Sequence, residues 1–283
     1  MRSAVWKSIE ATPRLERLYR AYRRLPDPVR AVLRGLAAPL RSSAASMVLA
    51  RSRETAVAGP FKGMALELSP VSRRHLLSYV LGTAELELRG VVDRAAARRY
   101  GTILNVGAAD GYYAVGLAMR SPASRIEAFE AKEELHAALH RVARRNGVAD
   151  RIAVHGSCSA ALLQARLAAA IGRTFVLMDI EGAEHDLLDP ARTPLLEGAD
   201  ILVETHDLYA PNCTDDLVAR FSATHDIERY ATRPRVPADF PPDFFPLLPR
   251  LLPATALDLM DERRAGPQEW LHMVARSPDG ARP

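Results

Sequence analysis

A glycine-rich turn and a distant carboxylate are the first residues whose types and spacing could do chemistry. Gly107 and Gly111 follow the apolar run 102–106 and precede a helical stretch. Glycine in such a turn lets the backbone approach a ligand closely, and the helix offers free N–H groups to a polar or anionic group. Glu130 follows about 20 residues later, at the end of the next apolar run, where a carboxylate can bind both hydroxyls of a ribose. Together these residues predict an adenosine-containing cofactor.

The residues between the two glycines discriminate between such cofactors. The turn reads Gly107-Ala108-Ala109-Asp110-Gly111. A dinucleotide site usually carries a second glycine where Ala109 stands, and Asp110 would bring negative charge toward a pyrophosphate. S-adenosylmethionine has no phosphate and carries a positive sulfonium and a positive ammonium. The turn therefore favours S-adenosylmethionine, with a nicotinamide-dependent oxidoreductase as the alternative enzyme class.

Acids and histidines follow two further apolar runs, 175–180 and 200–205. The carboxyl ends of parallel strands meet at the edge where ligands bind, so we expect these groups to face one ligand. Methyl transfer to oxygen needs a base, and histidine titrates near neutral pH. The catalytic candidates, in order, are His206, His185 and Glu204. Two interpretations stay open beside this one: a hydrogen-bonded loop histidine, and a Mg²⁺ or Mn²⁺ site formed by Asp179, Glu204 and His206.

The elements that must position these residues alternate short apolar runs with helical stretches. Strands are expected at 102–106, 125–130, 151–155, 175–180, 200–205, 226–231 and 270–276, and helices at 112–119, 132–145, 159–171 and from a Thr214 cap to about 224. This rhythm predicts a doubly wound α/β fold, a parallel sheet with helices on both faces.

A proline-rich stretch interrupts the pattern before the last strand. Seven prolines lie between residues 234 and 253, with Phe240, Phe244 and Phe245 among them. We expect no helix or central strand there. An ordered loop anchored by buried phenylalanines and a lid over the substrate are the two interpretations.

Three segments of the chain resemble the FkbM-type branch of class I S-adenosylmethionine-dependent methyltransferases. They are residues 105–112 (NVGAADGY), 128–130 (AFE) and 178–184 (MDIEGAE). The resemblance covers roughly residues 100–207. It implies a Rossmann-like seven-stranded sheet in the order 3-2-1-4-5-7-6 with the last strand antiparallel, and methyl transfer, commonly to oxygen, on sugars or natural products.

The resemblance also implies roles for individual residues. Glu130 would bind the ribose, and Asp179 would lie near the methionine end. The family's usual Asp before the first glycine is Asn105 here, and its usual Asn before the second is Asp110, so the negative charge has moved. Independently of the resemblance, Ser157 and Cys158 follow the strand at 151–155 and are candidates to line the adenine pocket, with a core thiol as the alternative for Cys158. The expected cofactor contacts are Asn105, Gly107, Ala108, Asp110, Gly111, Tyr112, Glu130, Ser157 and Asp179.

Charge divides the chain unequally. The net charge is +4, but residues 1–53 carry twelve Lys or Arg against three acids, a local +9 that leaves −5 for the rest. This split argues against a nucleic-acid partner, whose footprint would spread over the fold. Helical spacing over 14–25 and a break at Pro26-Asp27-Pro28 predict two helices. Packing on the core, contact with an anionic membrane and a cleaved targeting peptide are alternative roles for them.

Composition sets the remaining expectations. The chain has 283 residues, 48% of them hydrophobic, which excludes a wholly disordered protein. No apolar run approaches the ~20 residues of a membrane helix, and Cys158 and Cys213 fit free thiols in a cytoplasmic, at most membrane-peripheral, protein. We expect a basic helical extension at 1–57, a cap segment at 58–99 and a methyltransferase domain at 100–277 with a lid-like insertion at 232–267. The acceptor would be a small molecule or glycan, and a catalytically silent cofactor-binding scaffold is the non-enzymatic alternative.

Overall fold

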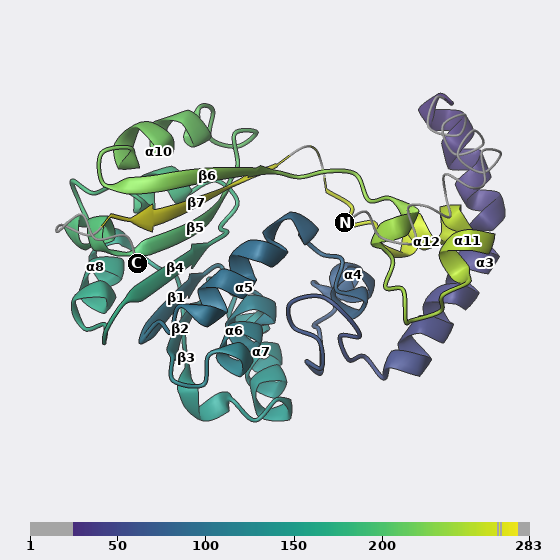
Figure 1. The fold of residues 1–283 in the computed structure, drawn as a ribbon, viewed down its shortest axis with the longest axis horizontal. Helices are drawn as coiled ribbons and strands as arrows, with labels where there is room; N and C mark the ends of the chain where they lie inside the picture. The colour runs from purple at the N-terminus through teal and green to yellow at the C-terminus, as the bar shows by residue number, and fades with distance from the viewer. Residues whose placement is uncertain (1–24, 265, 267, 277–283) are drawn as a thin grey trace.

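One seven-stranded sheet organises the chain in a computed structural model that describes residues 25–264, 266 and 268–276. The strand order is β3-β2-β1-β4-β5-β7-β6 (Figure 1). β1 to β5 run parallel, and β7 pairs antiparallel with both β5 and β6. The strands are β1 (Thr102–Val106), β2 (Arg125–Phe129), β3 (Ile152–His155), β4 (Thr174–Met178), β5 (Asp200–Thr205), β6 (His225–Ala231) and β7 (Glu269–Ala275). The predicted strand order and antiparallel last strand are confirmed, and the fold is the Rossmann-like α/β fold of methyltransferases.

Helices cover both faces of the sheet because successive strand side chains point to opposite sides. Ile103 of β1 packs into the core under α5, α6 and α7, whereas the next residue, Leu104, packs into the core under α8 and α10. The α-helices of these two layers are α5 (Arg89–Ala97), α6 (Tyr112–Arg120), α7 (Glu133–Arg145), α8 (Ala160–Ala168), α9 (Glu184–Leu187) and α10 (Cys213–Phe221). Short 3₁₀ turns lie at Arg73–His75, Leu86–Leu88, Ala149–Arg151, Pro194–Gly198 and Pro237–Asp239. Every side chain of β1 is buried, as a central parallel strand requires.

Several predicted boundaries differ from the structure by one to three residues. Thr214 does not cap α10: the cap position is Asn212, with φ 67°. The hydroxyl of Thr214 instead lies within hydrogen-bond distance of Thr205 and Asp207, which ties α10 to the end of β5. The helix expected to reach residue 171 ends at Ala168.

The proline-rich segment contains helix, which corrects the expectation from proline density. α11 (Leu248–Leu251) and α12 (Pro253–Leu259) each carry a proline in the first turn, where a missing N–H breaks no helical hydrogen bond. Phe240 and Phe244 are buried as predicted.

Two further helices lie outside the sheet layers. α3 (Asp27–Ser52) begins directly after Pro26, inside the predicted break, and packs against α12 and α4 (Leu76–Leu81). α3, α11 and α12 form a body at one end of the molecule, beyond the sheet (Figure 1). The first of the two predicted N-terminal helices lies almost entirely outside the described residues.

Candidate active site

The carboxyl ends of the parallel strands line one cavity of about 780 Å³, a volume typical of small-molecule sites. It opens beside β1 and β4, the switch point of the parallel sheet, where ligands are expected. The strand ends contribute Gly107, Ala109, Glu130, Asp179, Glu204 and His206. Segments outside the sheet add Tyr79, Glu85, Glu262 and Arg264, and Glu85 is hydrogen-bonded to both Glu262 and Arg264.

The glycine turn is required for close packing between two strand ends. Gly107 has φ +86°, and a Cβ placed on it would lie 1.8 Å from the carbonyl oxygen of Asp179. Any side chain at this position would push the β1 turn away from the β4 turn. Gly107 therefore holds Asp179 beside the cofactor turn, in addition to leaving its backbone open to a ligand.

Glu130 is fixed against that turn. One carboxylate oxygen accepts a hydrogen bond from the backbone N–H of Ala109 at 2.8 Å, and the other from the N–H of Lys132 at 2.8 Å. The residue is only 8% exposed and borders the cavity. Each carboxylate oxygen keeps lone pairs for further donors, so Glu130 is oriented to accept hydroxyl groups. Ser157 and Cys158 line the same cavity.

Several predicted cofactor contacts do not border the cavity: Asn105, Ala108, Asp110, Gly111 and Tyr112. The Asp110 carboxylate accepts hydrogen bonds from the N–H and the hydroxyl of Ser69, at 2.7 and 3.0 Å. The Asp110 carboxylate therefore binds the segment that precedes α4. A direct contact between this carboxylate and a cofactor ammonium would require Ser69 to move. Tyr112 contacts the cavity only through Tyr79. The two rings stack with their centres 3.8 Å apart, and Tyr79 lines the cavity.

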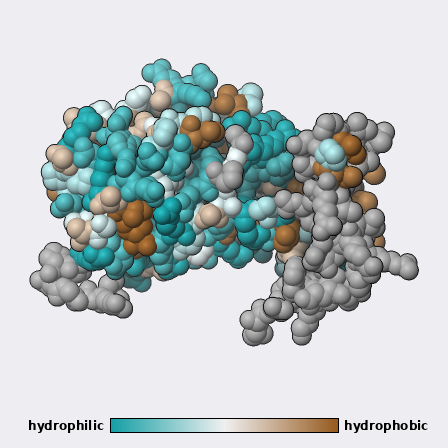
Figure 2. All heavy atoms as spheres, turned by 90° about the horizontal axis from the view of Figure 1, so that it is seen from above, coloured by the Kyte–Doolittle hydropathy of each residue, from teal (hydrophilic) through white to brown (hydrophobic). Residues whose placement is uncertain are grey.

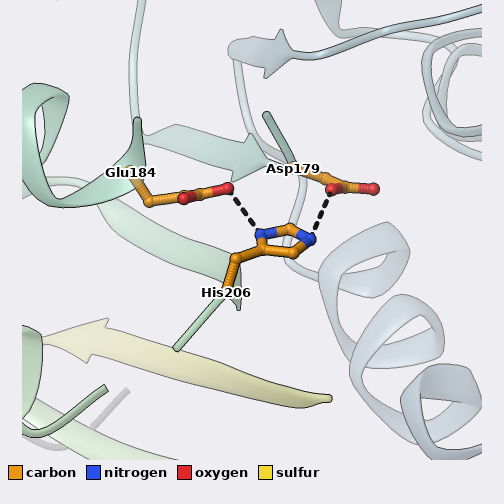
Figure 3. Close-up of side chains that lie close together, drawn as sticks. All are labelled: Asp179, Glu184 and His206. Atoms are coloured by element: carbon orange, nitrogen blue, oxygen red, sulfur yellow. Dashed lines mark hydrogen bonds and ion pairs between the residues drawn. The ribbon is translucent and has the colours of Figure 1, made fainter. Parts of the chain in front are cut away.

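His206 lies between two carboxylates (Figure 3). Its Nδ1 is 2.8 Å from Glu184, and its Nε2 is 3.7 Å from Asp179. Nε2 is also 3.7 Å from an oxygen of Glu204. The ring is thus held on one edge, while the other edge faces the cavity.

Glu184 is held in place by the loop that carries it. Its two oxygens accept hydrogen bonds from the N–H groups of Ile180 and Gly182, at 3.0 and 2.8 Å. The loop wraps around the carboxylate because Glu181 and Gly182 both adopt positive φ, 55° and 118°. The most distinctive part of the sequence resemblance, residues 178–184, therefore builds the orienting partner of His206.

The protonation states follow from this geometry. Burial raises the pKa of Glu184, but hydrogen bonds from His206 and from backbone N–H groups outweigh it and lower the pKa overall. Burial lowers the pKa of His206, but the hydrogen bond and charge of Glu184, with the charge of Glu204, raise it overall. An ionised carboxylate only accepts hydrogen bonds, so Nδ1 carries the proton. Nε2 is left to exchange a proton with a ligand.

A cluster of acids surrounds one arginine at the inner wall of the cavity. Burial, followed by the charge of Asp179, raises the pKa of Glu204 to about 8. Burial and neighbouring carboxylates also raise the pKa values of Asp179 and Glu85 to about 7. Arg264 donates to Glu204 at 2.5 Å and to Glu85 at 2.8 Å. Near neutral pH these carboxyl groups are therefore partly protonated, and a cationic ligand would favour their ionised forms.

The predicted metal ligands Asp179, Glu204 and His206 converge on the Nε2 side of the imidazole. Two carboxylates and an imidazole are a donor set that Mg²⁺ or Mn²⁺ accepts. Asp179, Glu184 and His206 also place ligand atoms within 4.8 Å of one another, but the ring separates the two carboxylates (Figure 3). One ion at one ring nitrogen cannot face both. Arg264 already supplies positive charge to Glu204, so the geometry favours a proton acceptor over a metal ligand.

His185, the second candidate base, lies elsewhere. Its Nε2 is 3.2 Å from a carboxylate oxygen of Asp216 and also contacts Arg220. It does not border the cavity. Sequence reasoning missed Tyr79, Glu85 and Arg264, since no motif marks residues that reach the site from outside the sheet.

No protein-family model matches this chain, and no curated protein matches it. Solved structures with a similar fold include the O-methyltransferase TomG from Streptomyces achromogenes in complex with SAM. TomG is 14% identical in sequence. The match covers 89% of this chain and 100% of TomG, with a TM-score of 0.43. An O-methyltransferase from Bacillus cereus in complex with SAH is 15% identical in sequence. The match covers 82% of this chain and 90% of that protein, with a TM-score of 0.40. Cofactor-bound Rv0187 from MTB is 19% identical in sequence. The match covers 74% of this chain and 92% of that protein, with a TM-score of 0.38.

Proposed function

We propose that this protein is an S-adenosylmethionine-dependent methyltransferase of the FkbM-type branch that methylates a hydroxyl oxygen of a small molecule or glycan. The observation that carries the proposal is the buried Glu184–His206 pair. Its free ring nitrogen faces the same cavity that Glu130 and the glycine turn border. A ribose-binding carboxylate and an oriented proton acceptor thus share one site.

The residues of the cavity fit this cofactor. Glu130 would accept the ribose hydroxyls, and Ser157 and Cys158 would line the adenine end. A cationic sulfonium or ammonium group would favour the ionised forms of Asp179 and Glu204, whereas a pyrophosphate would oppose them, which disfavours NAD. When bound, S-adenosylmethionine supplies a methyl group on a positively charged sulfur.

His206 supports proton removal from the acceptor. The acceptor hydroxyl must lose its proton as its oxygen forms the new bond, and Nε2 of His206 takes that proton. Nδ1–H stays bonded to Glu184, whose negative charge stabilises the resulting imidazolium. A base held by a third group in this way is a common arrangement for activating a nucleophile. Asp179 and Glu204, each 3.7 Å from Nε2, then face a positive ring.

The proposal is tested by a transfer assay. The protein is incubated with S-adenosylmethionine carrying a deuterated methyl group and with a panel of hydroxylated small molecules and oligosaccharides, and products are followed by mass spectrometry. We expect a labelled methyl ether and S-adenosylhomocysteine, both nearly lost in His206→Ala. Cofactor binding without turnover on any acceptor would favour the silent scaffold, and stabilisation by NAD instead of S-adenosylmethionine would establish an oxidoreductase.

A further inference from the structure

Exposed apolar side chains gather at the end of the molecule that lies beyond the sheet. Among the described residues, eleven large hydrophobic side chains are exposed, and six of them belong to α3 or α11 and its flanks. The six are Val29, Leu40, Met47, Leu247, Leu251 and Leu252. Figure 2 shows a mostly hydrophilic surface with small, separate apolar spots over the sheet, and apolar side chains that also reach the surface at the α3 end.

Part of α3 packs against the rest of the protein. Ala44 and Val48 are buried against the core, and the guanidinium of Arg51 lies 5.3 Å from the ring centre of Phe245. Leu40 and Met47 are seven residues apart, hence on one face of the helix, and they are 57% and 54% exposed. Both side chains therefore keep more than half of their surface open to solvent.

α11 also exposes apolar side chains. Leu247, the residue just before this short helix, and Leu251, its last residue, are four residues apart and are 58% and 70% exposed. The exposed Arg250 lies between them in the sequence. From here the chain passes through α12 to Glu262 and Arg264, so the exposed face is continuous in sequence with a wall of the cavity.

The sequence of α3 is basic. α3 and the residue after it contain five arginines and one acid, Asp27. Residues 1–53 as a whole carry +9, whereas the rest of the chain carries −5. Apolar side chains beside arginines match an anionic bilayer surface, into which leucines insert while arginines bind lipid phosphates. A second copy of this chain would bring like charge against like charge.

We propose that α3 and α11 form a docking surface for an anionic lipid bilayer. Leu247 and Leu251 enter the interface, and Arg250, Arg41 and Arg51 bind the headgroups. The attachment is peripheral, because no helix in the part of the chain that the structure describes is long and apolar enough to cross a membrane.

The test is co-sedimentation of the full chain with vesicles of phosphatidylcholine alone or of phosphatidylcholine with phosphatidylglycerol. We expect binding only to the mixed vesicles, weakening steeply as the salt concentration rises. Leu247→Ser with Leu251→Ser should weaken binding about 10-fold or more, and Arg250→Gln about 5-fold. Ile171→Ser, at a position 59% exposed and remote from α11 in the fold, is the matched control and should bind like the wild type.

A second variant guards against misfolding of the first. Met47→Ser changes one exposed side chain of α3 and should also weaken binding, with an unchanged circular dichroism spectrum. Equal binding to both vesicle types, or unchanged binding of the folded double variant, would overturn the proposal. A dimer seen by light scattering in the wild type and lost in the double variant would overturn it in favour of self-association.

Discussion

Glu184 and His206 form a buried pair in which the carboxylate lies 2.8 Å from Nδ1, with the two side chains 0% and 3% exposed. Backbone N–H groups of Ile180 and Gly182 fix the carboxylate, so the imidazole has one orientation. Its Nε2 faces the cavity lined by Glu130 and Asp179.

Glu184→Gln should lower turnover by about 10- to 100-fold without weakening cofactor binding, because the amide keeps the shape but loses the charge. Glu184 raises the pKa of His206, so the acidic limb of the pH–rate profile should move to lower pH in the variant. A purely structural role would leave that limb in place. Asp215→Asn, at a side chain 80% exposed, is the matched control and should behave like the wild type.

His206→Ala should lower turnover by about 10²–10⁴-fold, the usual contribution of a general base. Affinity for S-adenosylmethionine should barely change, since the imidazole would touch the acceptor and not the adenosine. Steady-state kinetics and calorimetry on the same preparation separate the two quantities. A fully active His206→Ala would mean that the acceptor is already ionised or that another group removes the proton.

Chelation separates the base from a metal ligand. Arg264 already pairs with Glu204, so we expect methyl transfer to continue after treatment with EDTA. Loss of activity that added Mg²⁺ or Mn²⁺ restores would instead assign Asp179, Glu204 and His206 to a metal site.

Glu204 predicts a pH dependence of stability. Its pKa is about 8 in the folded chain and about 4.3 when unfolded, so the folded state binds the extra proton between these values. Stability therefore falls as pH rises through that window. Glu204→Gln removes the effect, and its Tm should exceed that of the wild type by about 3 °C or more at pH 9, with the gap closing at pH 4. Thermal unfolding across this range checks the sign. Glu133→Gln, on the exposed surface of α7, should show no such trend, and a Glu204→Gln curve parallel to the wild type would refute the shift.

The alternation of apolar runs was enough to predict the strands, and with them the meeting of Glu130, Asp179 and His206 at one edge. That success is physical: residues after parallel strands must emerge on the same side of the sheet. Side-chain direction was not predictable in the same way. Asp110 turns to Ser69, 41 residues earlier in the chain, because the cap segment folds back over the glycine turn.

Two other features depend on local geometry that no residue pattern encodes. Glu184 reaches His206 only because Glu181 and Gly182 adopt positive φ. Arg264 reaches Glu204 from 60 residues away, through a proline-rich segment whose helices proline density alone argued against. Prolines in a first turn are compatible with helix, which a count of prolines does not reveal.

The central claim is that the cavity binds S-adenosylmethionine through Glu130, and titration calorimetry tests it most directly. The wild type should bind S-adenosylmethionine and not NAD. Glu130→Ala should weaken binding by roughly 10- to 100-fold, as expected for loss of charged hydrogen bonds, whereas the exposed neighbour Glu134→Ala should leave it unchanged. Equal affinity in wild type and a folded Glu130→Ala variant, or binding of NAD alone, would contradict the account.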